Sequence, residues 1–399
     1  VSQRRGFEVV AKPLDTYVEE PGLERDVLIK WYTQLRVGVV DAGLLESMRE
    51  AGCETVFYGL ESMCPEVLRS MNKKLKPAEI EHALELTYQS RMDSFGNFIF
   101  GDPAETTETA WETLDWWVKN RRYFVNLGKI DCWPGTKIYH DAIARGIIQD
   151  KIAFIEQGCP LINMTRMPST EFLDMLKRVW VLHQGLLWPG LLLAARVDED
   201  GCASVRCRCP HCEVEVEFVH LETTALHADR SAHRLPCGNC GRSFDIPLRL
   251  PPVAHAEPTR ALFEKALAQR AAGDLDGAME SLLALFESTR EHPVAVVVAA
   301  SIRLAQGHVE RAKELVRLAM QFNPSTPFLM DWAALCYELY GDARMARIFA
   351  DQARLLRQCR APGLEGAELE RLDPMELRYR ELFPTGTDGV VVGSSPGAQ

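Results

Sequence analysis

Short apolar runs alternate with segments of helical spacing between residues 28 and 165, and this alternation limits the possible folds more than any other feature of the chain. Such alternation is typical of right-handed βαβ units that share one parallel sheet. Four strands amount to half a barrel or to a small open sheet, so we expect a partial α/β barrel over residues 28–190 and leave its closure open. The expected strands are 28–37, 55–58, 98–100 and 125–132.

The third expected strand ends at Gly101 and leads into a candidate ligand turn. Its residues, 98–100, are all apolar, which predicts a strand buried on both faces. Asp102 is expected to cap the next helix, with Pro103 as its first residue and Glu105 closing a capping box. Ligands of parallel α/β sheets bind beyond the carboxyl ends of the strands. An ordinary strand-to-helix connection is the alternative.

Two Cys-x-x-Cys pairs lie 24 residues apart within residues 202–250. A Cys-x-x-Cys turn places two thiolates at two corners of a tetrahedron around Zn²⁺. Short alternating runs flank the pairs, so we expect a small zinc-ribbon-like β module whose four ligands make a closed, structural site. A redox pair is the alternative. The expected ligands are Cys209, Cys212, Cys237 and Cys240, with Cys202, Cys207, His211 and His233 in reserve.

Alanine and glycine recur with a period of 34 residues after the proline-rich stretch 251–258. This period, with small residues at helix contacts and turns, resembles the tetratricopeptide repeat, a helix–turn–helix unit. Residues 259–357 are therefore expected to form an all-α domain of three repeats that binds a protein partner on a concave surface. A generic array of helical hairpins is the alternative. The recurring positions are Ala266, Gly273 and Ala278; Ala300, Gly307 and Ala312; and Ala334, Gly341 and Ala346.

A net charge of −11 disfavours broad binding to nucleic acid or to an anionic membrane. The longest apolar run, 179–195, is broken by polar residues and proline, which argues against a membrane span. No export signal opens the chain, so its cysteines indicate a reducing compartment, and a cytoplasmic location is expected. Because the first residue is Val1, we expect the unassigned residues 1–27 to follow a truncation, and the Gly- and Ser-rich residues 379–399 to be disordered.

An ordered set of short motifs over residues 28–165 resembles the radical S-adenosylmethionine family, and within it the group that often carries a cobalamin-binding domain. The motifs fall at the ends of expected strands or in the helices that follow, and their order is more specific than any single one. They are Trp31 with Arg36; Ala-Gly-Cys at 51–53; Gly-Leu-Glu-Ser at 59–62; Val67 and Leu68 with Met-Asn-Lys at 71–73; Gly-Asp-Pro-Ala-Glu-Thr at 101–106; and Pro-Gly-Thr at 134–136 with Tyr139.

The resemblance implies a site for S-adenosylmethionine at the carboxyl ends of the strands. Glu61 and Ser62 are implied to lie beside the ribose and methionine parts of the cofactor. Gly101 is implied to approach the adenine while Glu105 holds the turn, and Arg36 is implied to face the cofactor carboxylate. The implied cofactor-binding set is Arg36, Gly59, Glu61, Ser62, Gly101 and Glu105.

In this family a [4Fe-4S] cluster reduces S-adenosylmethionine and releases a 5′-deoxyadenosyl radical, while the protein orients and shields the chemistry. The resemblance therefore implies an enzyme that catalyses methyl transfer or another radical reaction on an unknown substrate. Whether the enzyme also uses cobalamin is left open. The family's Cys-x-x-x-Cys-x-x-Cys trio does not occur in the sequence, and thiolates hold such clusters. We therefore expect this chain to be the carboxyl-terminal portion of such an enzyme and to be inactive on its own. The alternative is a non-catalytic, protein-binding scaffold with a decayed barrel.

Overall fold

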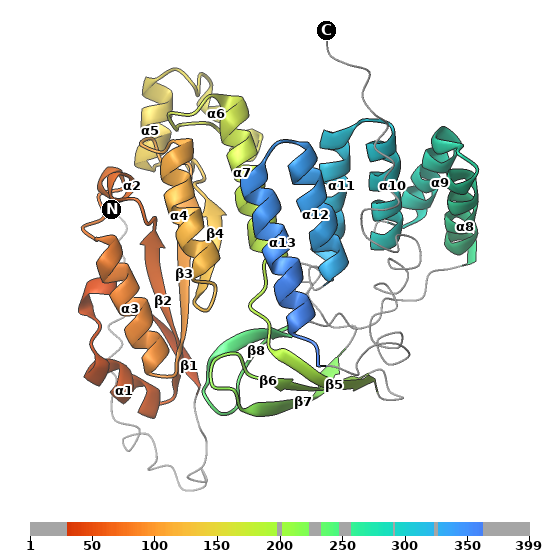
Figure 1. Cartoon of the computed structure of the whole chain (residues 1–399). Coiled ribbons are helices and arrows are strands. Elements are labelled where there is room, and N and C mark those ends of the chain that lie inside the picture. The colour runs from red at the N-terminus through yellow and green to blue at the C-terminus, as the bar shows by residue number, and fades with distance from the viewer. Residues whose placement is uncertain are drawn as a thin grey trace, which may run out of the picture.

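The computed structural model describes residues 30–197, 202–222, 233–246, 257–289, 292–322 and 326–361. The expectations for residues 1–27 and 379–399 lie outside these ranges. Figure 1 shows an α/β unit, a small β module and an array of helices in chain order. Across the described residues, no helix combines the length and the apolar character that crossing a bilayer requires.

Four parallel strands form the sheet of the α/β unit, in the order β1-β2-β3-β4. They are β1 (Trp31–Leu35), β2 (Cys53–Glu61), β3 (Asp93–Phe100) and β4 (Phe124–Lys129). The accompanying helices are α1 (Ala42–Glu50), α2 (Pro65–Ser70), α3 (Pro77–Gln89), α4 (Thr107–Lys119) and α7 (Ser169–Gly185). Because β1 and β4 are edge strands of the described sheet, this part of the chain forms an open sheet, not a closed barrel.

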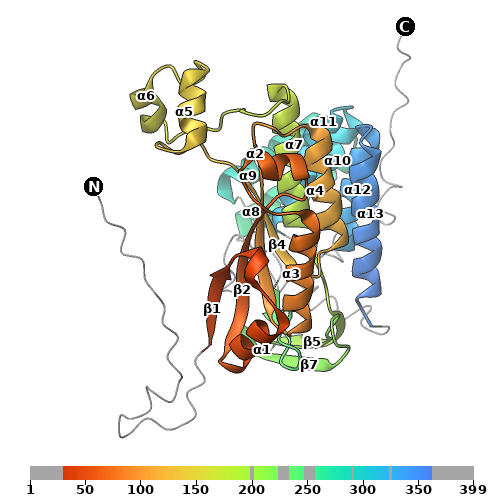
Figure 2. The ribbon, with the colours of Figure 1, turned by 90° about the vertical axis from the view of Figure 1, so that its left-hand side faces the viewer.

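The third strand is buried on one face only, which corrects the expectation that both of its faces are buried. Phe98 and Phe100 are buried, whereas Asn97 is exposed and Ile99 is half-buried. The reason is that α3 and α4 lie on one side of the sheet, as Figure 2 shows. On the other face, aromatic rings form a row across the strands, with centroids 4.8 to 5.3 Å apart. The row consists of Tyr32, Phe57, Phe95 and Phe124.

The helix after β3 begins later than expected, so the predicted cap was wrong. Thr106 is the N-cap of α4, and its hydroxyl accepts a hydrogen bond from the first turn. Asp102 instead accepts from the N–H of Ala104 at 2.8 Å. Glu105 does not close a capping box either, because its carboxyl turns back to the N–H of Gly101. Both acidic side chains are thus used within a buried turn that precedes the helix.

Two expected strands are shorter than their apolar runs suggested. β1 ends at Leu35 and a short 3-10 helix, Val37–Val39, follows it, while β4 ends at Lys129 instead of Cys132. After β4, α5 (Lys137–Ala144) and α6 (Lys151–Glu156) project away from the sheet in Figure 2. Their own small core includes Tyr139 and Phe154.

The small β module contains two antiparallel sheets. The first consists of β5 (Leu191–Val197), β6 (Cys202–Arg208) and β7 (Glu215–Glu222), and the second of β8 (His233–Pro236) and β9 (Ser243–Ile246). The N–H of Trp188 donates to Asp245 Oδ2 at 2.6 Å, and the N–H of Gly190 donates to the Asp245 carbonyl at 3.0 Å. A Cβ at Gly190 would lie 2.5 Å from the Phe244 ring. The segment that enters the module is therefore fixed by packing and hydrogen bonds.

The carboxyl-terminal part of the described chain forms three helical hairpins. The helices are α8 (Glu257–Ala271), α9 (Leu275–Ser288), α10 (Pro293–Ala305), α11 (Val309–Phe322), α12 (Pro327–Leu339) and α13 (Ala343–Gln358). The second helices of the hairpins begin at positions 275, 309 and 343, so 309−275 and 343−309 both equal 34. Gly273, Gly307 and Gly341 turn between the paired helices with φ of 83°, 79° and 86°.

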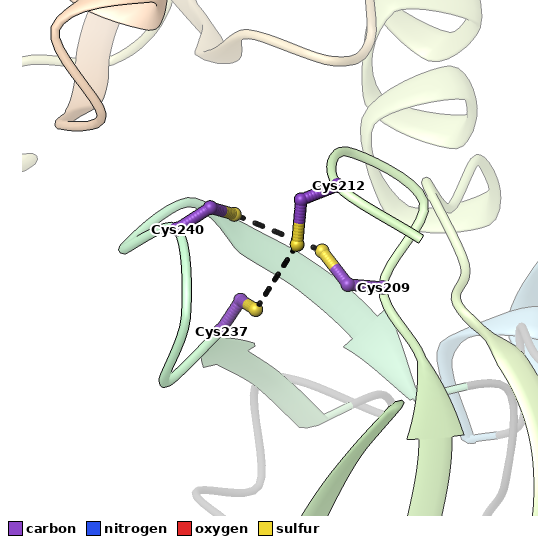
Figure 3. Close-up of side chains that lie close together, drawn as sticks. All are labelled: Cys209, Cys212, Cys237 and Cys240. Carbon is purple, nitrogen blue, oxygen red and sulfur yellow. Dashed lines mark hydrogen bonds between the residues drawn. The ribbon is translucent and has the colours of Figure 1, made fainter. Parts of the chain in front are cut away.

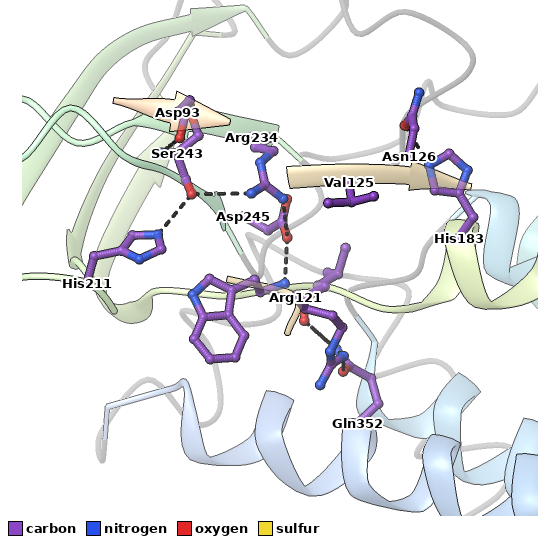
Figure 4. Close-up of polar contacts among 12 residues, drawn as sticks. Asp93, Arg121, Val125, Asn126, His183, His211, Arg234, Ser243, Asp245 and Gln352 are labelled. Atoms are coloured by element: carbon purple, nitrogen blue, oxygen red, sulfur yellow. Dashed lines mark hydrogen bonds and ion pairs between the residues drawn. The ribbon is translucent and has the colours of Figure 1, made fainter. Parts of the chain in front are cut away.

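Helix α7 joins the α/β unit to these hairpins. Gly185 at its end packs on α13, where a Cβ would lie 3.1 Å from Phe349. Arg178 Nε donates to Asp342 Oδ2 at 2.8 Å, and this ion pair is largely buried. Figure 4 shows a second polar link, in which Arg121 of the α/β unit donates to the side-chain oxygen of Gln352 on α13. The hairpins therefore rest on the α/β unit through both apolar and polar contacts.

Candidate functional site

The carboxyl end of β2 presents an acidic and a basic side chain in direct contact. Glu61 Oε1 lies 2.7 Å from Lys73 Nζ, and the two side chains are 15% and 39% exposed. Glu61 has a left-handed backbone, with φ of 66°, which is uncommon for a residue other than glycine. Gly59 leaves room for the pair, since a Cβ there would come within 3.1 Å of Glu61 Oε1. A strained backbone at this edge of a parallel sheet is a reason to suspect a ligand site.

Ser62 supports this turn from the interior. It is buried, and its Oγ lies 3.0 Å from Thr113 Oγ1 on α4. The Ser62 hydroxyl oxygen also accepts from the N–H of Cys64 at 3.0 Å, and Thr113 Oγ1 accepts from the N–H of Met63 at 3.0 Å. These bonds anchor the residues after β2 to α4, so Ser62 positions Glu61 while its own hydroxyl faces inward.

Gly101 and Glu105 form a closed turn at the end of β3. The N–H of Gly101 donates to Glu105 Oε2 at 2.7 Å, and the φ of Gly101 is 117°. A Cβ there would meet Ile130 and Phe172 at ordinary contact distances of 3.5 and 3.7 Å, so the positive φ is what requires glycine. Burial raises the pKa of Glu105 to about 8, although the hydrogen bond from Gly101 opposes the shift. At neutral pH the carboxyl is therefore mainly protonated and belongs to the turn.

Arg36 lies just beyond β1, as the residue that precedes the 3-10 helix, and its side chain is exposed. Its carbonyl accepts from the N–H of Val39 at 3.2 Å. The parallel register places the ends of β1, β2 and β3 at one edge, so Arg36, Glu61 and Gly101 all lie there. Within the described chain, no hydrogen bond or ion pair joins the Arg36 guanidinium to the other two residues.

Sequence reasoning assigned no role to Lys73, although this residue lies within the Met-Asn-Lys motif. It follows Asn72, whose φ is 55°, directly after the short helix α2. A left-handed asparagine at a helix end returns the chain toward the helix it has just left, and here that return brings Lys73 to Glu61. The pair offers a ligand one anionic acceptor and one cation, which suits a zwitterionic or hydroxyl-bearing molecule.

The four cysteines of the two Cys-x-x-Cys pairs meet in the β module, as Figure 3 shows. Their Sγ atoms all lie within 4.8 Å of one another, with Cys209 to Cys240 at 3.8 Å and Cys212 to Cys237 at 3.7 Å. Four sulfurs around one Zn²⁺ at bonds of about 2.3 Å are separated by roughly 3.8 Å. The group therefore fits a single ion held by four thiolates.

Each cysteine pair lies in a turn between two strands, the first between β6 and β7 and the second between β8 and β9. Donors near the sulfurs favour thiolates: the N–H of His211 lies 3.4 Å from Cys209 Sγ, and Asn239 Nδ2 lies 3.5 Å from Cys212 Sγ. Of the reserve ligands, Cys207 lies outside the group, and the His211 ring is turned away to other partners. The side chains of Cys202 and His233 lie outside the described residues.

No family model matches the chain. It is 24% identical over 168 residues, 41% of its length, to an uncharacterized methyltransferase of Pyrococcus horikoshii. It is also 29% identical over 110 residues, 27% of its length, to the bacteriochlorophyllide d C-8(2)-methyltransferase of Chlorobaculum tepidum. The chain spans 35% and 24% of the lengths of these two relatives. It is thus similar, over part of its length, to proteins named as methyltransferases.

Solved structures with some likeness to the chain include two enzymes described as radical S-adenosylmethionine enzymes. The coproporphyrinogen III oxidase HemN of Escherichia coli matches with a TM-score of 0.29 and 12% identity, over 74% of this chain and 69% of that one. The cobalamin-dependent enzyme OxsB matches with a TM-score of 0.26 and 14% identity, over 91% of this chain and 47% of that one. The described residues combine a polar edge on a parallel sheet with a group of four cysteines that could hold a metal ion.

Proposed function

We propose that the α/β unit binds S-adenosylmethionine at the carboxyl ends of β2 and β3 and takes part in a methyl transfer of the radical S-adenosylmethionine type. The observation that carries the proposal is the pair of Glu61 and Lys73, which a left-handed backbone presents beside the closed turn at Gly101. Similarity to proteins named as methyltransferases supports the same reaction class. When bound, the cofactor would supply the transferable methyl group.

The side chains at this edge match the polar parts of the cofactor. A carboxylate such as that of Glu61 accepts hydrogen bonds from ribose hydroxyls, and an ammonium such as that of Lys73 binds a carboxylate. Arg36 offers a second cation at the same edge. Because the buried Glu105 is mainly protonated at neutral pH, it adds little charge behind the site.

We assign no iron–sulfur cluster ligands to this chain, because its sequence holds no Cys-x-x-x-Cys-x-x-Cys and its four grouped cysteines fit one ion. Cobalamin stays a proposed second cofactor that rests on the resemblance to the cobalamin-associated group.

Isothermal titration calorimetry of the full chain with S-adenosylmethionine tests the proposal. We expect one binding site per chain, with affinity reduced at least tenfold in Glu61→Gln and in Lys73→Met. The matched control is Glu66→Gln, because Glu66 lies close in sequence but pairs with Arg166 at the surface. Binding should be unchanged in that control. Absence of binding in the wild-type chain, or equal affinity in all the variants, would refute the proposal.

We also propose that the four grouped cysteines hold one structural zinc ion. Four protein ligands close the coordination shell, which is typical of a structural site and leaves no open position for catalysis. None of the cysteines whose side chains the structure describes forms a disulfide, which suits the reducing cytoplasm that we propose as the location. Elemental analysis should find one zinc per chain and none in Cys240→Ser. A full complement of zinc in that variant would contradict this assignment.

A further inference from the structure

The loop that follows the second cysteine pair contacts the amino end of β3. Ser243 donates twice to Asp93, the first residue of that strand: its N–H lies 2.8 Å from Oδ1, and its hydroxyl bonds to Oδ2. Figure 4 shows the two side chains facing each other. Asp93 is thus held by a residue only three positions after the expected ligand Cys240.

The turn between α3 and β3 is held by further residues next to the cysteines. Arg242 Nε donates to the Tyr88 carbonyl at 2.8 Å, and its guanidinium carbon lies 3.8 Å from the centre of the Tyr88 ring. From the first cysteine pair, His211 Nδ1 lies 3.1 Å from the Tyr88 hydroxyl, and its Nε2 donates to the Ser243 carbonyl at 3.0 Å. Tyr88 is therefore contacted by His211 from the first cysteine turn and by Arg242 beside the second, and His211 also joins the two turns through Ser243.

The backbone of Gly241 lies close to the backbone of Arg91. The φ of Gly241 is 73°, and a Cβ there would lie only 2.7 Å from the backbone carbonyl oxygen of Arg91. Arg91 is itself left-handed, with φ of 59°. Two turns with positive φ thus pack backbone to backbone, and this contact tolerates little displacement of either one.

We infer that the four-thiol group is a metal-dependent clamp on the amino end of β3. The inference rests on the proposed zinc ion and is independent of the proposed binding of S-adenosylmethionine. The loop that carries Gly241, Arg242 and Ser243 follows Cys240 directly and connects the short strands β8 and β9, so a bound ion would help to order the residues that make these contacts. The ordered loop fixes Tyr88, Arg91 and Asp93, and β3 then continues from Asp93 to the turn at Gly101. Metal occupancy at one end of the strand would therefore set the local stability of the whole strand.

Hydrogen–deuterium exchange of the full chain, with zinc bound and after chelation, tests the clamp. In the wild-type protein, chelation should speed amide exchange at least tenfold in residues 88–100 as well as in the cysteine loops. In Asp93→Ala, residues 88–100 should exchange fast even with zinc bound, and chelation should change their rate less than twofold. Zinc content should be unchanged, because no ligand is altered. Asp115→Ala is the matched control, since Asp115 pairs with Arg344 away from the cysteines; it should keep the wild-type response.

Ser243→Ala is a milder second variant, because it removes only the hydroxyl bond to Asp93, and it should show a reduced response to chelation with normal zinc content. The inference is overturned if chelation of the wild-type protein speeds exchange in the cysteine loops while residues 88–100 keep their rate. It is also overturned if Asp93→Ala responds to chelation as the wild type does. A wild-type chain without zinc would refute the zinc proposal itself, which the elemental analysis detects separately.

Discussion

At the scale of single residues, Glu105 is the most informative side chain. Burial raises its pKa from the ordinary value of 4.5 to about 8. Between these two pH values the folded state keeps a proton that the unfolded chain has released, so the free energy of unfolding falls as pH rises through this window. The stabilisation from the protonated carboxyl is complete below about pH 4.5 and is lost as pH passes about 8.

Glu105→Gln should remove this pH dependence, because glutamine can still accept from the Gly101 N–H and does not ionise. We expect the variant to be more stable than the wild type by roughly 2–4 kcal/mol at about pH 8.5, and similar to it near pH 4. Urea denaturation across this pH range provides the measurement, with Glu66→Gln as an exposed carboxylate control. Parallel pH profiles for wild type and Glu105→Gln would show that Glu105 titrates normally.

The sequence located Glu105 but not its partner. A carboxylate three residues after Asp102 matches a capping box, and the same spacing also allows it to reach back to Gly101. The φ of 117° at Gly101 decides between the two, because it turns that N–H toward the Glu105 carboxyl. Such a dihedral angle cannot be read from residue types alone.

At the scale of elements, α4 supports the carboxyl end of β2 through Thr113. This hydroxyl is buried, accepts from the Met63 N–H and contacts Ser62. Thr113→Val keeps the shape and leaves the buried N–H without a partner, so we expect a loss of about 1–3 kcal/mol in the free energy of unfolding. Chemical denaturation measures it, with the exposed Thr170→Val as control. Equal stabilities of the two variants would mean that the turn after β2 does not depend on α4.

The hairpin turns illustrate which element features are predictable. Glycine at a fixed place in each 34-residue period indicated a turn, and each of the three glycines has positive φ. At Gly307 a Cβ would meet no atom within 4 Å, so the backbone conformation is the whole reason for glycine. Gly307→Ala should therefore cost about 1 kcal/mol.

Gly38→Ala is the control for this substitution, because Gly38 is equally open but its φ is not positive. Its stability should change by less than about 0.5 kcal/mol. Thermal unfolding of both variants gives the comparison, and an unchanged midpoint in Gly307→Ala would argue against strain at the turn.

At the scale of the whole molecule, α7 packs against the helical hairpins of its own chain and covers part of their surface. The protein partner expected from the repeats is therefore proposed for the surface that α7 leaves free. The contact includes the Arg178–Asp342 pair, whose side chains are 23% and 11% exposed. A shielded pair of this kind contributes more than an exposed one, because solvent screens it less.

A double-mutant cycle measures this link between the α/β unit and the hairpins. Arg178→Met removes the charge, and Asp342→Asn keeps an acceptor for the cap of α13, where Asp342 receives the N–H of Met345. We expect a coupling energy of about 1 kcal/mol that decreases with added salt. Strictly additive effects would indicate that this ion pair contributes nothing to the link between the two parts.

The sequence by itself determined the features that local patterns encode. Alternating apolar runs indicated a parallel α/β unit, a 34-residue period indicated hairpins with glycine turns, and two Cys-x-x-Cys pairs identified the four cysteines that meet in space. Only the tertiary structure decided that one face of β3 stays partly exposed, that Glu61 pairs with Lys73, and that Ser243 contacts Asp93. Ser243 and Asp93 are 150 positions apart in the sequence. Such contacts depend on how separately folded segments pack, and no periodicity in the chain records that packing.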